Sequence, residues 1–163
     1  GYLQPHESGK VVKALLRYPT APWNWGATAD FELPADVTPQ EGIVWQENPR
    51  YNRVFVSGVS AGVLGQITRA GTDGASIAPM VTDALITHAD AARQRGVREL
   101  APGGRQAMVS LQLPVLETTG IIPPGKMVRY VDGSTTRVGI TRSVQVDVRM
   151  PEIFQSIEVE TYA

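Results

Sequence analysis

The sequence predicts a mainly β fold, a sandwich or barrel with one flanking helix and an extended N-terminal arm. The chain has 163 residues, of which 42% are hydrophobic and 19% charged, and this is enough apolar material for one packed domain. Its 16 glycines and 12 prolines exceed what a helical bundle tolerates and favour strands joined by turns. Alternating apolar and polar residues recur after residue 50, whereas clear helix signals occur in one segment only.

Residues 1–50 are expected to form the arm or linker. They hold half of the prolines and all three tryptophans, Trp23, Trp25 and Trp45. Proline at this density interrupts helices and central strands. The prolines are Pro5, Pro19, Pro22, Pro34, Pro39 and Pro49. The tryptophans require burial, either on the chain's own domain or on a neighbouring subunit, and both alternatives stay open.

Residues 51–163 are expected to form the domain. Residues 53–57 and 63–69 have strand patterns, and Gly58–Gly62 between them is the predicted hairpin loop. A helix is predicted over about 87–101, with Thr87 as its N-cap and Asp90 completing a pair of the capping-box type. The apolar stripe of this helix is mostly alanine, so we expect the helix to lie close against a sheet.

Further strands are predicted at residues 107–113, 126–131, 138–150 and 153–159. The turn signal Asp132-Gly133-Ser134 precedes the longest of them. Its apolar residues are expected on one face, interrupted only by Arg142; they are Val138, Ile140, Val144, Val146, Val148 and Met150. Arg142 either reaches a carboxylate, a carbonyl or a subunit boundary, or the strand bulges there and the side chain points outward.

The amino-acid composition excludes several classes of function. The chain has no cysteine, which excludes disulfides, thiolate catalysis and zinc–cysteine sites. Its two histidines, His6 and His88, leave little for metal binding or general-base catalysis. The net charge of −1 argues against binding nucleic acid through bulk positive charge. We therefore expect no enzyme, no cofactor, no metal, no specific nucleic-acid binding and no membrane insertion.

Two groups of residues nonetheless match patterns that occur in enzyme active sites. Gly58-Val59-Ser60-Ala61-Gly62 matches the G-x-S-x-G nucleophile elbow, with Asp83 and His88 downstream in the right order for a triad. The segment after Ser60 is strand-like, whereas an elbow requires a helix there. Glu158 and Glu160 are spaced to share a strand face, which suits a carboxylate pair of a glycosidase, a solvated face, or a rim that meets arginines of a partner.

Two further readings use surface side chains. The basic cluster Arg93, Arg95, Arg98 and Arg105 is interpreted as a solvated helix end. A carbohydrate-binding β-sandwich that uses exposed tryptophans is an alternative function, beside the serine hydrolase that uses Ser60.

Several strings occur in an order that is similar to a known family. Residues 48–58, NPRYNRVFVSG, resemble the opening strand of phage tail hub and baseplate hub proteins. The order of the later segments resembles these proteins through residue 162; the segments are RAGTDG at 69–74, DALIT at 83–87, RQRG at 93–96, LP at 113–114, PPGKMV at 123–128, GITRSVQV at 139–146 and FQSIEVE at 154–160. The likeness spans roughly residues 44–162 and resembles the hubs of long-tailed phages, D-type hubs of contractile tails included.

The resemblance implies a structural role without catalysis. Such hubs are ring subunits that join the tail tube to a baseplate, tip or spike, and they use tail-tube-type β-barrel domains with a flanking helix. The expected partners are further copies of the chain and other tail proteins, in a virion whose proteins are made in the host cytoplasm. Known hubs usually carry two such domains, so we expect a fragment or a pared-down hub. The expected subunit-interface residues are Trp23, Trp25, Trp45, Arg142, Glu158 and Glu160.

Overall fold

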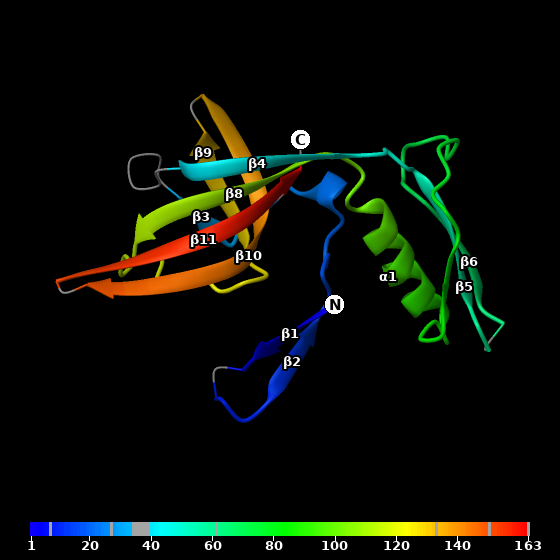
Figure 1. The fold of residues 1–163 in the computed structure, drawn as a ribbon, viewed down its shortest axis with the longest axis horizontal. Coiled ribbons are helices and arrows are strands. Elements are labelled where there is room, and N and C mark those ends of the chain that lie inside the picture. The colour runs from blue at the N-terminus through cyan, green and yellow to red at the C-terminus, as the bar shows by residue number, and fades with distance from the viewer. Residues whose placement is uncertain are drawn as a thin grey trace. The chain divides into compact units, whose positions relative to one another are not determined.

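The structure, a computed structural model, describes residues 1–6, 8–26, 28–33, 40–60, 62–132, 134–149 and 151–162. It is mainly β, as predicted, with a single α-helix among these residues (Figure 1). Its strands form a two-stranded, a six-stranded and a three-stranded sheet. The six-stranded sheet is open, with β3 (Phe31–Glu32) at one edge and β4 (Gln40–Asn48) at the other, so its described strands do not close into a barrel.

The chain divides into two compact units. Unit 1 comprises Gly1–Ala21 and Asn48–Gly104, and unit 2 comprises Pro22–Glu47 and Arg105–Ala163. Segments from both sides of residue 50 therefore enter each unit, since β4 belongs to the six-stranded sheet together with strands from the second half of the chain. The division into an arm of residues 1–50 and a domain of residues 51–163 stays a prediction about independent folding.

Unit 1 contains a small sheet covered by the helix. Its strands are β5 (Arg53–Gly58), β6 (Leu64–Thr68) and β7 (Val81–Asp83), in the order β6-β5-β7. The predicted antiparallel hairpin of β5 and β6 is confirmed, and β7 joins β5 in parallel. The N-terminal strands β1 (Tyr2–Pro5) and β2 (Val12–Leu15) form a separate antiparallel hairpin.

Helix α1 (Ala89–Leu100) lies close against this sheet because small residues face it. A Cβ atom added at Gly96 would lie 2.6 Å from Ile67 Cγ1 of β6, and the Cβ of Ala92 is 3.2 Å from the position of a Cβ on Gly65. The expectation drawn from the alanine-rich stripe is thus confirmed. The buried residues of unit 1 include Val54, Val56, Ile86, Ala92, Leu100 and Ala101.

The helix begins one residue later than the capping pattern predicts. His88 is the N-cap, and its Nδ1 accepts a hydrogen bond from the backbone N–H of Asp90 at 3.3 Å. Thr87 is held in the preceding turn, where its N–H donates to Leu85 O at 3.1 Å. The prediction of Thr87 as N-cap is therefore wrong, because the carbonyl of His88 accepts the first helical hydrogen bond, from the N–H of Ala92 at 3.1 Å.

Unit 2 is built on the six-stranded sheet, in the order β3-β9-β10-β11-β8-β4. The remaining bounds are β8 (Gly104–Pro114), β9 (Met127–Asp132), β10 (Thr135–Arg149), β11 (Glu152–Tyr162) and a short 3-10 helix, Pro22–Asn24. The predicted alternation of β8 is confirmed, since Ala107, Val109, Leu111 and Leu113 are all buried. They share one core with Leu33, Ile122, Val128, Tyr130, Ile157 and Val159.

A bulge in β10 changes which residues share a face. Thr141 pairs with Val159 and Ser143 with Glu158, so Arg142 is an extra residue on this strand. Val144 pairs with Ile157 on the core side, whereas Ile140 pairs with Glu160 on the opposite side. The prediction of one continuous apolar face is therefore wrong, because one inserted residue inverts the alternation.

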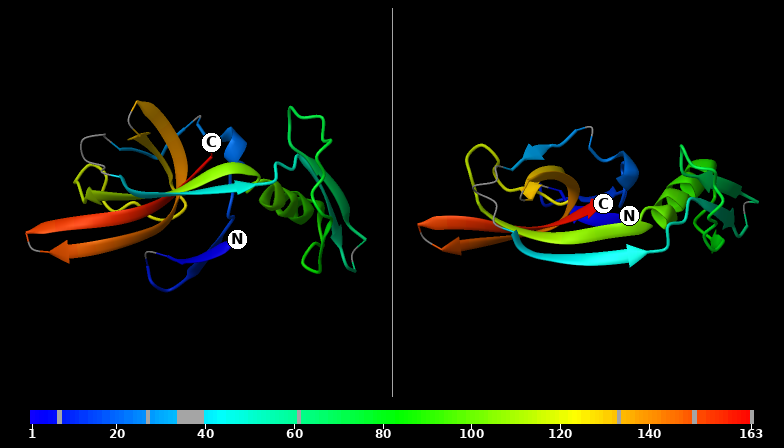
Figure 2. Two further views of the ribbon diagram at one scale, coloured as in Figure 1. Left: turned by 45° about the horizontal axis from the view of Figure 1, so that its top comes forward. Right: turned by 90° about the horizontal axis from the view of Figure 1, so that it is seen from above.

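Some predicted features fall outside the described residues, namely Pro34, Pro39, Ala61, Gly133 and Met150. In the part of the chain that is described, no helix is long and apolar enough to cross a bilayer. In both views of Figure 2 the hairpin of β10 and β11 extends beyond the neighbouring strands. This agrees with the pairing, because β9 accompanies β10 only as far as Ile140.

Candidate interaction surfaces

Arg142 and Glu160 form a mostly buried ion pair on the face of the sheet opposite the main core. Arg142 Nε donates to Glu160 Oε2 at 2.6 Å, and the two side chains are 11% and 5% exposed. Both open interpretations of Arg142 hold in part, because the strand does bulge and the side chain does reach a carboxylate. The signal in the sequence was a charged residue within an otherwise apolar alternation.

Glu158 lies on the same face as Glu160 but in a different environment. Its side chain is exposed, and its Oε2 accepts a hydrogen bond from Ser143 Oγ at 2.8 Å. The two carboxylates thus differ in burial and in partner. The assignment of Arg142, Glu158 and Glu160 to a subunit interface stays a prediction, and two of these side chains already contact each other within the chain.

Trp45 lies on β4, at the edge of the six-stranded sheet. The guanidinium carbon of Arg105 is 4.0 Å from the centre of its ring, and that of Arg137 is 5.7 Å away. Such cation–π contacts orient the ring at an exposed edge. Trp45 is 38% exposed and its neighbour Val44 is 62% exposed, so this edge presents apolar surface together with positive charge.

Trp23 and Trp25 lie beside the start of β10 in unit 2. Both are half-buried and line an open groove of about 290 Å³. Its other lining residues are Pro22, Gly26, Thr135, Thr136, Arg137, Val138 and Tyr162. Aromatic rings and hydroxyl groups therefore predominate over aliphatic side chains in this groove.

The GVSAG motif is explained by packing in a hairpin. A Cβ atom at Gly58 would lie 2.2 Å from the carbonyl oxygen of Ile86, so a side chain does not fit there. Gly62 has φ +63°, a conformation that favours glycine in a turn. Ser60 is exposed in this loop and is followed by strand β6, so the strand–turn–helix geometry of a nucleophile elbow is lacking.

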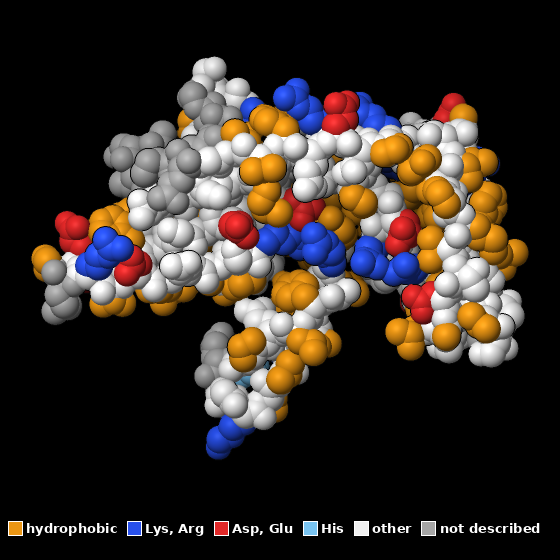
Figure 3. All heavy atoms as spheres, viewed as in Figure 1, with side chains coloured by type: hydrophobic (Ala, Val, Ile, Leu, Met, Phe, Trp, Pro, Cys, Tyr) orange, Lys and Arg blue, Asp and Glu red, His pale blue; other side chains and the backbone are white. Residues whose placement is uncertain are grey.

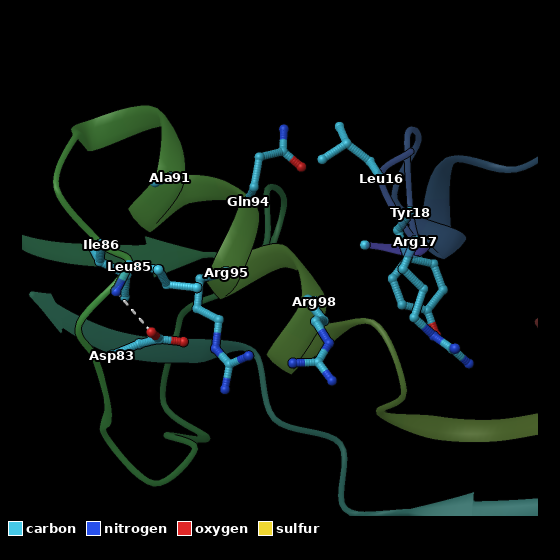
Figure 4. A pocket seen from close by; sticks show the side chains of 11 residues that line it. Leu16, Arg17, Tyr18, Asp83, Leu85, Ile86, Ala91, Gln94, Arg95 and Arg98 are labelled. Carbon is cyan, nitrogen blue, oxygen red and sulfur yellow. Dashed lines mark hydrogen bonds between the residues drawn. The ribbon is translucent and has the colours of Figure 1, made fainter. Parts of the chain in front are cut away.

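A pocket of about 200 Å³ in unit 1 has three arginines in its lining (Figure 4). Arg95 and Arg98 come from α1 and Arg17 from the segment after β2, with Asp83 also in the lining. Arg95 forms an ion pair with Glu99 at 3.2 Å. The predicted basic cluster is divided in the structure, since Arg105 belongs to unit 2 and contacts Trp45.

The pKa of the Asp30 carboxyl is lowered from its ordinary value. Met127 N–H donates to Asp30 Oδ2 at 2.8 Å, and this bond is the main reason that the pKa of Asp30 is lowered. Partial burial opposes the shift, and Lys126 Nζ, 3.1 Å from Oδ1, adds to it. Asp30 thereby attaches the segment before β3 to the start of β9. Within the described ranges, no group of three or more His, Asp or Glu residues could hold a metal ion.

Apolar side chains are exposed on the N-terminal hairpin. In Figure 3 hydrophobic side chains cover much of β1 and β2. The most exposed large ones are Leu3, Val11, Val12 and Leu16. An isolated two-stranded hairpin is only marginally stable in water, and packing of these apolar side chains against further protein would stabilise it.

Comparison with known proteins gives a likeness of fold. No family model matches the sequence, and no curated protein matches it. The structure is similar to the 43 kDa tail protein of prophage MuSo2 from Shewanella oneidensis, with a TM-score of 0.50 and 14% identity, over 82% of this chain and 44% of that chain. A second similar structure is the tail protein from Neisseria meningitidis MC58, with a TM-score of 0.45 and 10% identity, over 84% of this chain and 45% of that one.

At 14% identity the first likeness establishes a shared fold, and the lower TM-score of the second adds no argument. The chain spans less than half the length of either protein. The shared fold nevertheless covers both units of the chain over most of their residues.

Proposed function

We propose that this chain is a structural component of a phage tail, a hub-like ring subunit that joins the tail tube to a baseplate, tip or spike. The observation that carries the proposal is the fold likeness to the 43 kDa tail protein over 82% of the chain. The order of the sequence strings quoted above supports the same family. Catalysis is not part of the proposed role.

The exposed edges of the protein suit assembly. A ring subunit needs edges and faces that pair with its neighbours. β4 is a nine-residue edge strand with Val44 exposed, and the hairpin of β1 and β2 exposes Leu3 and Val12. We place the contact between copies at the β4 edge, with Trp45 at its centre, because tryptophan and arginine are enriched at energetically important interface positions.

The test measures self-association and incorporation together. Light scattering after gel filtration should give a defined oligomer, and antibody labelling of purified tails should mark one end of the tube. Val44→Lys should shift the oligomer toward monomer, because lysine on an edge strand opposes strand pairing. Leu85→Lys, at an exposed position of unit 1, is the matched control and should assemble normally. A purified chain that stays monomeric at all concentrations and is absent from tails would contradict the proposal.

The groove of Trp23 and Trp25 favours a second candidate function, carbohydrate binding. Aromatic rings can stack on the C–H faces of sugars, while the hydroxyls of Thr135 and Thr136 offer hydrogen bonds. A titration of tryptophan fluorescence with a panel of mono- and disaccharides tests it. Saturable quenching that is lost in Thr136→Val would support sugar binding, and a flat response to the whole panel would end this candidate.

A further inference from the structure

A groove runs along the whole of β6, beside helix α1. It has a volume of about 260 Å³ and is lined by Val63, Leu64, Gly65, Gln66, Ile67, Thr68, Ala89, Ala92 and Arg93. β6 is the edge of its three-stranded sheet, with β5 on its inner side. The groove therefore combines a strand edge with a helical wall.

The register identifies which backbone groups of β6 face the groove. Gly58 N–H donates to Val63 O, and Arg69 N–H donates to Asn52 O, both at 2.8 Å. In an antiparallel pair, hydrogen-bonded residue pairs alternate with pairs that make no such bonds. Gly65 and Ile67 lie at even steps from these two bonds, opposite Val56 and Val54, so their backbone groups point toward β5.

The intervening residues Leu64, Gln66 and Thr68 consequently direct their N–H and C=O groups away from β5, toward the outer edge. Paired with Ser57, Phe55 and Arg53 respectively, they occupy the positions without hydrogen bonds to that strand. Their side chains are exposed. These three residues offer the backbone donors and acceptors that a further strand would use.

We propose that the groove binds an extended segment of a partner protein, which adds to the free edge of β6 as an antiparallel or parallel strand. This is strand addition, in which main-chain hydrogen bonds provide affinity and the flanking surface provides selectivity. At roughly 3.3 Å per residue, the five residues of β6 match a segment of about five residues. α1 bounds the groove on one side.

The lining defines the chemistry of the segment. Ala89 and Ala92 on the helix and Gly65 on the strand are small, which leaves room for apolar side chains at every second position of the segment. Arg93 is exposed at the rim of the groove and favours a carboxylate on the same segment. The partner is therefore a strand of alternating apolar residues with an acidic residue at one end.

The test uses the full chain, labelled with ¹⁵N, and the peptide Thr-Val-Thr-Val-Thr-Val-Asp as the probe. Amide shifts should concentrate at Leu64, Gln66, Thr68 and Arg93. The same peptide with N-methyl groups at alternate positions should not bind, because it lacks the donors. Hydrogen exchange checks the premise, since the amides of Leu64 and Gln66 should exchange faster than those of Gly65 and Ile67 in the free protein.

Gln66→Pro removes an outward donor and leaves the ladder to β5 intact, so it should lower the affinity about tenfold. Gln66→Ala is the matched control and should bind like the original chain. If Gln66→Pro disturbs the fold, Arg93→Glu still tests the site, because it should bind the peptide with Lys in place of Asp better than the acidic peptide. Absence of shifts along β6 at millimolar peptide, or equal binding by the proline and alanine variants, would overturn the proposal. Binding here is measured apart from tail incorporation, so either proposal can fail alone.

Discussion

Arg142 Nε donates to Glu160 Oε2 at 2.6 Å across two adjacent strands, and a bulge in β10 makes this contact possible. Arg142 is the inserted residue between Thr141 and Ser143. Ser143 lies opposite Glu158, and Arg142 reaches Glu160, two residues further along β11. The pair is almost enclosed, so its charges are poorly screened.

Removal of one partner should therefore be costly. Arg142→Ala leaves the buried carboxylate without its guanidinium, and we expect a loss of about 3–5 kcal/mol in the free energy of unfolding. Urea denaturation followed by circular dichroism measures it. The control is Arg149→Ala, whose pair with Asp147 at 2.9 Å has side chains that are 80% and 47% exposed.

The exposed control pair should change the free energy of unfolding by less than about 1 kcal/mol. A double variant, Arg142→Met with Glu160→Leu, removes both charges and should be more stable than either single variant. Equal, small effects of Arg142→Ala and Arg149→Ala would show that the buried pair does not stabilise the sheet.

Gly96 is expected to be required for the close approach of α1 to β6. Alanine there gains about 1 kcal/mol of helix propensity, but its Cβ would lie 2.6 Å from Ile67 Cγ1. Overpacking of this kind costs about 1–3 kcal/mol, so Gly96→Ala should lower the thermal midpoint. Differential scanning calorimetry measures the shift.

The companion variant distinguishes packing from other causes. Ile67→Ala removes Cγ1 and Cδ1, two of the three atoms that an added Cβ at Gly96 would approach within 2.8 Å, so Gly96→Ala should be tolerated better in that background than in the original chain. Gln94→Ala, on an exposed turn of the same helix, is the control for a change to alanine. An increase in the midpoint for Gly96→Ala alone would contradict this account.

Acid sensitivity should depend in part on Asp30. Its pKa is lowered in the folded protein, mainly by the N–H of Met127, so its contribution to stability is present above the unfolded pKa of about 4 and is lost as pH falls through the folded value. Between about pH 5 and pH 2, unfolding free energies of Asp30→Asn should fall less steeply than those of the original chain. Parallel pH profiles of the two proteins would refute the prediction.

Ser60 is expected to be unreactive. It lies in a hairpin loop followed by a strand, without the geometry that exposes and activates a nucleophile. Intact-mass analysis after treatment with a serine-reactive phosphonate should show no added mass. Labelling that disappears in Ser60→Ala would revive the hydrolase alternative.

The local pattern of apolar, polar and turn residues predicted several elements of unit 1 and part of the core of unit 2. The hairpin of β5 and β6, the alternation of β8 and the close-lying helix follow from residues near one another in sequence. The N-cap lies one residue later than predicted, because His88 rather than Thr87 accepts the first hydrogen bonds of the helix. Such errors are small, because helix and strand periodicity constrain a whole element but not its end.

The sequence alone determined the mainly β class, the single helix and the poverty in catalytic groups, because strand alternation, turn residues and composition are local properties of the chain. Only the tertiary structure decided the pairing of Arg142 with Glu160, the inversion of faces in β10 and the position of β4 in the six-stranded sheet. It also decided that β6 is the edge strand of its described sheet, beside α1. These features depend on strand register between segments far apart in the chain, and one inserted residue changes that register without altering the local pattern.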